Sequence, residues 1–395
     1  HPRWILNVPT KRHWRQPSRL DDVRQGLAAL VEVVRNFSAA DHRIEREIPL
    51  GTIPKHLSDR KEPFGFVDGI SQPIIRGTYR SYRNADPIHL VEPGEFILGY
   101  PDNRGNRPPG PSLKAIDDPD NLLPVQCDGQ GGFGVNIVDA PREIGRNGSF
   151  LVIRQLEQDV AAFNDYCEAE AERFRDRLGQ PYKISGQFIA AKLIGRWRDG
   201  SSLLRNPYHA HTDSKLREKQ PMQRPSTRSE SGAIARPPAS LGNMTSGAQE
   251  DTTPQDDKEK EKKKADRAAD NDYLFGTEDP QGLRCPLGAH VRRANPRDSF
   301  APGSQDQIDI SNRHRILRIG RTYVAPMGEK DGLMFMCLNG DIERQFEFIQ
   351  QTWLGSETFH GLSGERDALA GNREGSPDGF TIATRDGPIR LAGMS

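Results

Sequence analysis

Residues 332–353, GLMFMCLNGDIERQFEFIQQTW, contain the pattern that decides the fold class. The apolar run from Gly332 to Leu338 predicts a buried strand, and Asn339-Gly340-Asp341 predicts a turn. Apolar residues then recur at helical spacing, which predicts a helix whose inward face contains Ile342, Phe346, Ile349 and Trp353. This stretch therefore predicts a strand followed by a long helix.

The same order of elements is predicted earlier in the chain. Ser149–Gln155 is strand-like and apolar from Phe150 to Ile153, and a helix is expected from about Leu156 to Leu178. The inward face of this helix is expected to contain Val160, Phe163, Cys167 and Phe174. Two strand–helix units favour an α+β fold, in which helices cover sheets, over a helical bundle or an all-β barrel.

Two further segments shape the predicted organisation. Residues 21–34 predict an amphipathic helix, with Asp21 and Asp22 at its capping end and apolar residues on one face at Val23, Leu27, Leu30, Val31 and Val34. Residues 213–270 are nearly free of large apolar side chains, so burial cannot offset the entropy of ordering them. We interpret 213–270 as a largely disordered insertion; a partner-binding segment is the alternative.

Charge and composition exclude several classes of partner. The 395 residues contain 55 Lys plus Arg and 55 Asp plus Glu, so no basic field favours nucleic acid or an anionic membrane. No apolar run reaches the roughly 20 residues of a membrane-spanning helix, and no signal peptide is visible after His1. We expect a cytoplasmic protein, with secretion left open because His1 is not an initiating Met. The four widely spaced cysteines favour neither a zinc site nor a disulfide framework.

Two motifs match known binding-site patterns, but their sequence context does not support the corresponding function. Residues 129–134, GQGGFG, match the dinucleotide-binding fingerprint, but Val135–Val138 continues as a strand where that fingerprint needs a helix. An ordinary glycine-rich turn is the better interpretation. His209, His211 and Asp213 could be metal ligands, but no further ligand follows at a fixed spacing, so surface histidines are expected.

The stretch Phe64–Pro73, FGFVDGISQP, sets a single acid among apolar residues. Gly65 and Gly69 flank Asp68 and allow unusual backbone angles and the close approach of another group. One interpretation is an aspartate that holds a turn through its own backbone. The other is an acid–base group, because a carboxyl in apolar surroundings has an adjustable protonation state.

Two later segments contain side chains that are unusual for their surroundings. In residues 284–298, RCPLGAHVRRANPRD, two small residues precede His290 and leave room for a flat, bulky group beside the imidazole. Taken alone, a structural histidine explains His290 more simply. In residues 312–321, NRHRILRIGR, a period of two puts Ile316 and Arg318 on the same face. Arg318 would then point into an interior and need a ligand or a counter-ion.

Together these segments resemble the dye-decolourising peroxidases, most of all the larger bacterial and fungal members. The matching motifs are, in chain order, Gly65-x-x-Asp68-Gly69, residues 145–149, residues 190–197, Cys285–His290, Arg315–Arg318, Gly332–Phe335 and Gln345–Gln350. The resemblance covers most of the chain from about Phe64 to Gly371, apart from the insertion. It implies two ferredoxin-like α+β halves in a dimeric, barrel-like α+β arrangement, with 1–148 as the first half and 149–395 as the second, which holds most of a haem b group.

The resemblance also implies roles for individual residues. His290 would be the proximal ligand of the haem iron, and we expect Asp367 to accept the other N–H of its imidazole. Asp68 would act on peroxide as base and then as acid, and Arg318 would stabilise the developing negative charge. An apolar wall on the distal side of the haem is implied at Leu333 and Phe335. A carboxylate shuttle predicts an acidic activity optimum.

The implied substrates are hydrogen peroxide and small aromatic reductants such as dyes or phenols. Bulky donors could not reach a walled-off haem, so electrons would pass through surface residues, for which Trp353, Tyr323 and Trp197 are candidates; plain packing also explains each of them. The 64 residues before Gly65 and the few after Ile382 are fewer than the family normally has, so we expect a shortened chain. A haem-binding or scaffold protein without peroxidase turnover is therefore the alternative, and a homo-oligomer is possible in either case.

Overall fold

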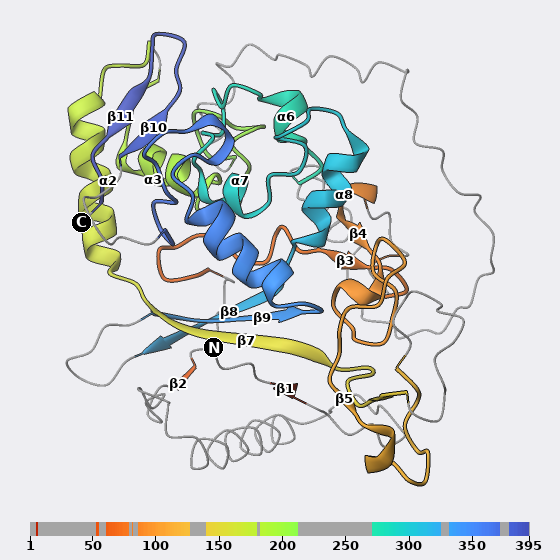
Figure 1. Cartoon of the computed structure of the whole chain (residues 1–395). Coiled ribbons are helices and arrows are strands. Elements are labelled where there is room, and N and C mark those ends of the chain that lie inside the picture. The colour runs from red at the N-terminus through yellow and green to blue at the C-terminus, as the bar shows by residue number, and fades with distance from the viewer. Residues whose placement is uncertain are drawn as a thin grey trace, which may run out of the picture.

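A computed structural model describes residues 5–6, 53–54, 61–78, 81, 86–126, 140–179, 182–211, 271–324, 332–371 and 379–394 (Figure 1). The predicted helix at 21–34, the glycine-rich stretch 129–134 and the predicted insertion 213–270 lie outside these residues, as does Cys127. Within the described part of the chain, no helix is long and apolar enough to cross a membrane. Cys167, Cys285 and Cys337 are buried free thiols.

The described helices and strands come in runs: the strands up to β7 precede the α-helices, and β8 to β11 follow them. The strands are β1 (Ile5–Leu6), β2 (Ile53–Pro54), β3 (Ile74–Ile75), β4 (Leu90–Val91), β5 (Ser112–Leu113), β6 (Arg142–Glu143), β7 (Ser149–Glu157), β8 (Leu317–Val324), β9 (Gly332–Asn339), β10 (Phe380–Ile382) and β11 (Ile389–Leu391). The α-helices are α2 (Val160–Phe174), α3 (Gly186–Ile194), α6 (Phe275–Glu278), α7 (His290–Ala294) and α8 (Gln305–Arg313). Short 3₁₀ turns are η2 (Pro87–His89), η3 (Pro93–Glu95), η4 (Ala115–Asp117) and η7 (Phe359–Gly361), and two π-helical segments are η5 (Glu343–Glu347) and η6 (Ile349–Leu354).

The main sheet has five strands in the order β1-β7-β9-β8-β2, and every neighbouring pair is antiparallel. Figure 1 shows α3, α7 and η6 on one side of this sheet. The register pairs Arg318 with Cys337 and Gly320 with Phe335. Because side chains alternate along a strand and paired residues share a face, Arg318 and Phe335 project from the same face.

The expected mixture of helices and antiparallel sheet is confirmed, but the expected barrel-like arrangement is wrong. The described strands form the open five-stranded sheet and three two-stranded sheets, β3–β4, β5–β6 and β10–β11. β1 and β2 precede residue 148, whereas β7, β8 and β9 follow it, so residues from both predicted halves share one sheet. The division of the chain at residue 148 stays a prediction.

Both predicted strand–helix units are present, with shifted boundaries. β7 continues to Glu157, so the helix expected from Leu156 begins only at Val160, after Asp159, whose carboxylate accepts a hydrogen bond from Ala162 N at 3.0 Å. The helix expected after β9 is π-helical, because Glu347 N donates to the carbonyl of Ile342, five residues earlier. Its later part buries Ile349 and Trp353, as predicted.

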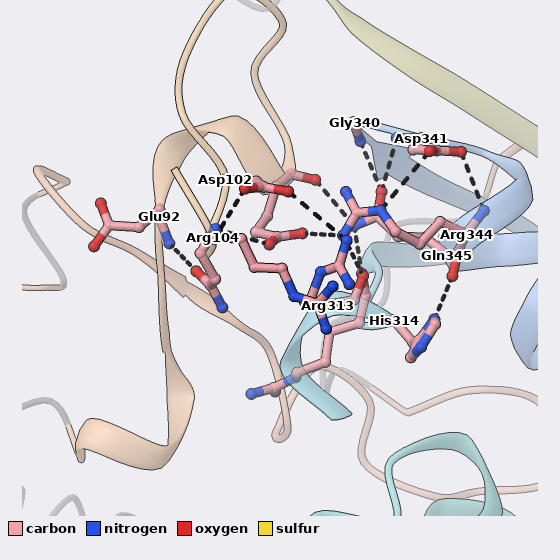
Figure 2. A network of polar contacts seen from close by, with 12 residues as sticks. Glu92, Asp102, Arg104, Arg313, His314, Gly340, Asp341, Arg344 and Gln345 are labelled. Atoms are coloured by element: carbon pink, nitrogen blue, oxygen red, sulfur yellow. Dashed lines mark hydrogen bonds and ion pairs between the residues drawn. The ribbon is translucent and has the colours of Figure 1, made fainter. Parts of the chain in front are cut away.

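A buried polar junction joins the start of β8 to the end of β9 (Figure 2). The side-chain amide of Gln345 donates to the backbone carbonyls of Glu95 at 2.9 Å and Arg315 at 2.8 Å, and its oxygen accepts from Asp341 N at 3.0 Å. Arg344 Nη1 forms an ion pair with Glu95 Oε2 at 2.6 Å. These contacts fix the backbone of Arg315, and with it the start of the strand that contains Arg318.

Candidate active site

Asp68 lies on a loop and forms an ion pair with Arg318 of β8. Gly65 and Gly69 have φ values of +92° and +79°, in the region where a side chain would be strained. Asp68 Oδ1 accepts a hydrogen bond from Gly69 N at 2.6 Å and also contacts Arg318 Nη1. The aspartate therefore holds its own turn, as one interpretation predicted, and in addition faces a cation. The side chains remain 22% (Asp68) and 30% (Arg318) exposed.

Gln72 fastens the loop of Asp68 to the strand of Arg318. Its Nε2 donates to Arg318 O at 2.5 Å, and its Oε1 accepts from Arg318 N at 3.2 Å. The described part of β2 pairs with β8 only at Tyr323 and Val324, so it does not extend to Arg318. The amide of Gln72 therefore satisfies both backbone groups of Arg318 and fixes their position relative to Asp68.

A second carboxylate, that of Glu62, organises the start of this loop. Glu62 accepts hydrogen bonds from Phe64 N and Phe66 N, both at 2.9 Å, and from Gln158 Nε2 at 2.8 Å. Burial raises the pKa of Glu62 above its usual value, although these three hydrogen bonds oppose the rise, and the charge of Asp68 adds to it. Glu62 therefore links the loop to the end of β7.

The predicted distal-wall residues, Leu333 and Phe335, lie on β9 opposite Thr322 and Gly320 of β8, on the face that carries Arg318. A Cβ atom added to Gly320 would lie 2.9 Å from Leu333 Cδ1 and 3.2 Å from Asp68 Oδ2. The absence of a side chain at this position lets Asp68 lie over the sheet. The structure thus brings these predicted residues together.

His290 is the first residue of α7, and its Nδ1 lies 3.1 Å and 3.2 Å from the two carboxylate oxygens of Asp367. Asp367 is fully buried, whereas the side chain of His290 is 33% exposed. Oδ1 of Asp367 also accepts from Leu369 N at 3.0 Å and Ala370 N at 2.8 Å. Burial alone would raise the pKa of Asp367, but the charge of His290 and these N–H groups together lower it. Asp367 is therefore held as an anion beside the imidazole.

Close packing fixes the helix that begins with His290. Gly195, with φ of +102°, ends α3, and a Cβ there would lie 2.2 Å from Val291 Cγ2. Arg292 is fully buried, and it donates to Cys285 O at 2.9 Å and to Asp279 O at 3.0 Å. α7 is thus tied both to α3 and to the turn that precedes it.

The two pairs act on one another electrostatically. Burial opposes protonation of His290, but Asp367 raises its pKa above the usual value; Arg318 lowers this pKa and Glu62 adds to it, both more weakly. His290 Nε2 accepts no hydrogen bond from, and donates none to, the described residues. An imidazole with one nitrogen tied to a buried carboxylate and the other available is the donor set expected of an axial haem ligand.

Other expectations were wrong or incomplete. Trp197, Tyr323 and Trp353 are buried, which agrees with plain packing and not with the surface role considered for them. His209 is also buried, whereas a surface histidine was expected. Gln72 lies in the stretch Phe64–Pro73, but the sequence predicted no role for it. Its signal was weak: an amide next to a proline in an otherwise apolar stretch.

No family model matches the chain. A dye-decolorizing peroxidase of Mycena epipterygia is 23% identical over 393 residues, which are 95% of this chain and 55% of that protein. The multifunctional dye peroxidase DyP2 of an Amycolatopsis species is 31% identical over 316 residues, 76% of this chain and 47% of the relative. The solved structure of an ancestral D-type dye-decolorizing peroxidase matches with a TM-score of 0.53 and 21% identity, over 86% of this chain and 59% of the other. The chain thus spans about half the length of the curated relatives it matches. The resemblance read from the sequence is confirmed, and the chain is a relative of the dye-decolorizing peroxidases with their α+β fold.

Proposed function

We propose that this chain is a haem peroxidase that reduces hydrogen peroxide with electrons from dyes, phenols or similar small aromatic donors. The observation that carries this proposal is that residues from four segments form two contacting pairs, Asp68 with Arg318 and His290 with Asp367. The sequence relatives support the same function, because they are named dye-decolorizing peroxidases.

Haem b is the proposed cofactor. His290 would bind the iron through Nε2, with its Nδ1–H donated to Asp367, and Leu333 and Phe335 would cover the opposite face. When bound, haem b supplies the iron at which the peroxide O–O bond is cleaved and stores the two oxidising equivalents until donors return two electrons. The carboxylate of Asp367 would raise the basicity of the imidazole.

Asp68 moves the proton within peroxide. Both hydrogen bonds that the described residues make to its carboxylate go to Oδ1, so Oδ2 is the oxygen that can accept a proton. In the proposed reaction, Oδ2 takes the proton from one peroxide oxygen and returns it to the other, which leaves as water. Because one group performs both transfers, it must stay close to both oxygens, and Gly69 and Arg318 hold it there.

Arg318 contributes a fixed positive charge rather than a proton. Its side chain is paired with Asp68, so in the proposed reaction it would lie near the oxygen that develops negative charge as the O–O bond breaks, and a fixed cation there would stabilise the transition state. Because carboxyl groups ordinarily titrate near pH 4 and imidazoles near pH 6.5, a carboxylate shuttle stays active at lower pH than a histidine would. We therefore propose an acidic optimum.

The rival function is haem binding without turnover, and purified protein separates the two. Haem is titrated into the chain while the Soret band is followed, and a dye is then added with and without hydrogen peroxide. A Soret band with peroxide-dependent bleaching supports the peroxidase, whereas a Soret band without bleaching supports a haem carrier. Absence of the band at any haem concentration would rule out both.

Several properties stay predictions. They are a cytoplasmic location, a possible homo-oligomer and the absence of nucleic-acid and membrane partners. The route of electrons from bulky donors is also open, but Trp353 is buried and its ring packs edge-on against His314 at 5.2 Å between centroids. Any transfer through Trp353 would therefore need a further residue at the surface.

A further inference from the structure

Arg293 is a fully buried cation in α7, three residues after His290. Its guanidinium donates hydrogen bonds to backbone carbonyls outside that helix. Nη1 donates to Trp353 O at 2.8 Å and to Ser356 O at 3.0 Å, and Nη2 donates to Glu365 O. One side chain thus ties the helix of His290 to the end of η6 and to the loop that follows it.

That loop carries Asp367. The carbonyl of Glu365, which accepts from Arg293, lies two residues before Asp367. Asp367 N in turn donates to Leu354 O at 2.9 Å, next to the Trp353 carbonyl that Arg293 also holds. The backbone that leads into Asp367 is therefore attached to Arg293 directly through Glu365 O, and indirectly through Leu354 O, next to the Trp353 carbonyl. A planar guanidinium suits this task, because its rigid fork of donors reaches several acceptors at once.

We propose that Arg293 is a positioning residue that sets the distance between the imidazole of His290 and the carboxylate of Asp367. Its place in the fold, between the helix that begins with one partner and the loop that carries the other, supports this role. The consequence for the haem iron rests on the proposed function. The geometry of the pair does not, because it can be measured in the haem-free protein.

Arg292 provides a matched control. It is as buried as Arg293 and adjacent to it in α7, but its guanidinium reaches in the other direction, to Cys285 O and Asp279 O. Arg292→Lys and Arg293→Lys both shorten a fully buried side chain and replace its guanidinium by an ammonium group. Among the hydrogen bonds of the described residues, only the second variant removes those to the loop that carries Asp367.

The first experiment is proton NMR of the haem-free protein. The Nδ1–H proton of His290, hydrogen-bonded to Asp367, gives a downfield resonance that is identified by its loss or displacement in Asp367→Asn. We expect Arg293→Lys to lose or displace the same resonance, and Arg292→Lys to keep it. An unchanged resonance in Arg293→Lys, with the protein folded, would overturn the proposal.

The second experiment uses the haem-loaded protein. A weaker bond to Asp367 makes the imidazole a poorer donor to iron, so Arg293→Lys should raise the Fe(III)/Fe(II) midpoint potential in the same direction as Asp367→Asn and weaken haem binding by about tenfold. If the wild-type chain binds no haem, the proposed function fails, and the NMR result still decides the role of Arg293. Equal potentials in Arg293→Lys and the wild type would contradict the inference.

A milder variant covers the case in which Arg293→Lys does not fold. The ring of Phe359 lies under the guanidinium, 4.9 Å from its central carbon. Phe359→Leu keeps Arg293 but removes the surface against which it is packed. We expect the His290 resonance to move in this variant as well; a resonance at the wild-type position would count against the proposal.

Discussion

The two pairs of the candidate site differ in how far their carboxylates are exposed to solvent. Asp68 and Arg318, on the predicted peroxide side, keep about a quarter of their side-chain surfaces exposed, at 22% and 30%. Asp367, on the other side, is fully buried and accepts hydrogen bonds from His290 and from two backbone N–H groups. The described residues leave Oδ2 of Asp68 without a hydrogen bond, whereas both oxygens of Asp367 lie within hydrogen-bond distance of His290.

This difference matches two chemical tasks. A group that must take up and return a proton needs access to its substrate, so it cannot be saturated with hydrogen bonds. A group that tunes a neighbouring imidazole works better away from water, where the local dielectric constant is low and the interaction is stronger. The comparison therefore assigns proton transfer to Asp68 and ligand tuning to Asp367, and it predicts different consequences for equivalent substitutions.

The largest effect is expected for Asp68→Asn, which keeps the shape of the side chain but removes its ability to accept a proton. The second-order rate constant for the reaction with peroxide should fall by about 100- to 10,000-fold, because that is the usual contribution of a positioned acid–base group. Stopped-flow absorbance measures it, and haem affinity should not change. Undiminished rates in both Asp68→Asn and Arg318→Leu would refute the assignment of the proton-transfer side.

The equivalent substitution on the other side, Asp367→Asn, should act on haem rather than on peroxide. Loss of a carboxylate that accepts from a ligating histidine typically costs about 10- to 100-fold in affinity or activity. We expect weaker haem binding and a higher midpoint potential, measured by haem titration and spectroelectrochemistry. If Asp367→Asn lowered only the peroxide rate, as Asp68→Asn should, the two sides would not be distinct.

A smaller effect is expected at Gln72, which connects the exposed pair. Gln72→Ala leaves the backbone N–H and C=O of Arg318 without their side-chain partner, which should cost about 1–3 kcal/mol of unfolding free energy. The peroxide rate should fall by less than in Asp68→Asn, since both catalytic side chains remain. Gln126→Ala is the control, because the one hydrogen bond that the Gln126 side chain makes to the described residues is a long 3.4 Å bond to Gly110 O, which is not part of the Asp68–Arg318 pair. Equal denaturant midpoints for the two variants would argue against the role of Gln72.

The smallest effect concerns the pH dependence of stability at Glu62. Its pKa in the folded protein is raised above 4.5, chiefly by burial, so the folded state disfavours its ionised form. The wild type should therefore lose stability relative to Glu62→Gln as the pH rises from 4.5 through the raised pKa, and the difference should level off above it. Melting temperatures of the haem-free proteins across this range measure the effect. A relative gain for the wild type over the same interval would contradict the stated sign.

The sequence predicted the regular elements better than the contacts between them. Apolar runs located β7 and β9 to within two residues, although the second half of β7 is exposed. The start of α2 was missed because the strand before it continues to Glu157 and Asp159 then caps the helix. The π-helical form of η5 and η6 has no signature in a pattern that only separates apolar from polar residues.

In the candidate site, too, the sequence predicted the main residues better than the contacts that position them. The resemblance brought Asp68, Arg318, His290 and Asp367 into view, and the structure places them as two contacting pairs. The residues that hold those pairs could not be found from the sequence. Gln72 contacts Arg318 across 246 positions, and Arg293 reaches Glu365 across 72, so neither contact follows from local spacing.

The most direct test of the central idea, that both pairs serve one haem, is a haem titration of the purified chain beside His290→Ala. The wild type should bind one haem per chain with the Soret spectrum of a histidine-ligated ferric haem. The variant should lose that spectrum and regain it when free imidazole is added. Identical spectra and affinities for the two proteins, or no haem binding by the wild type, would contradict the account.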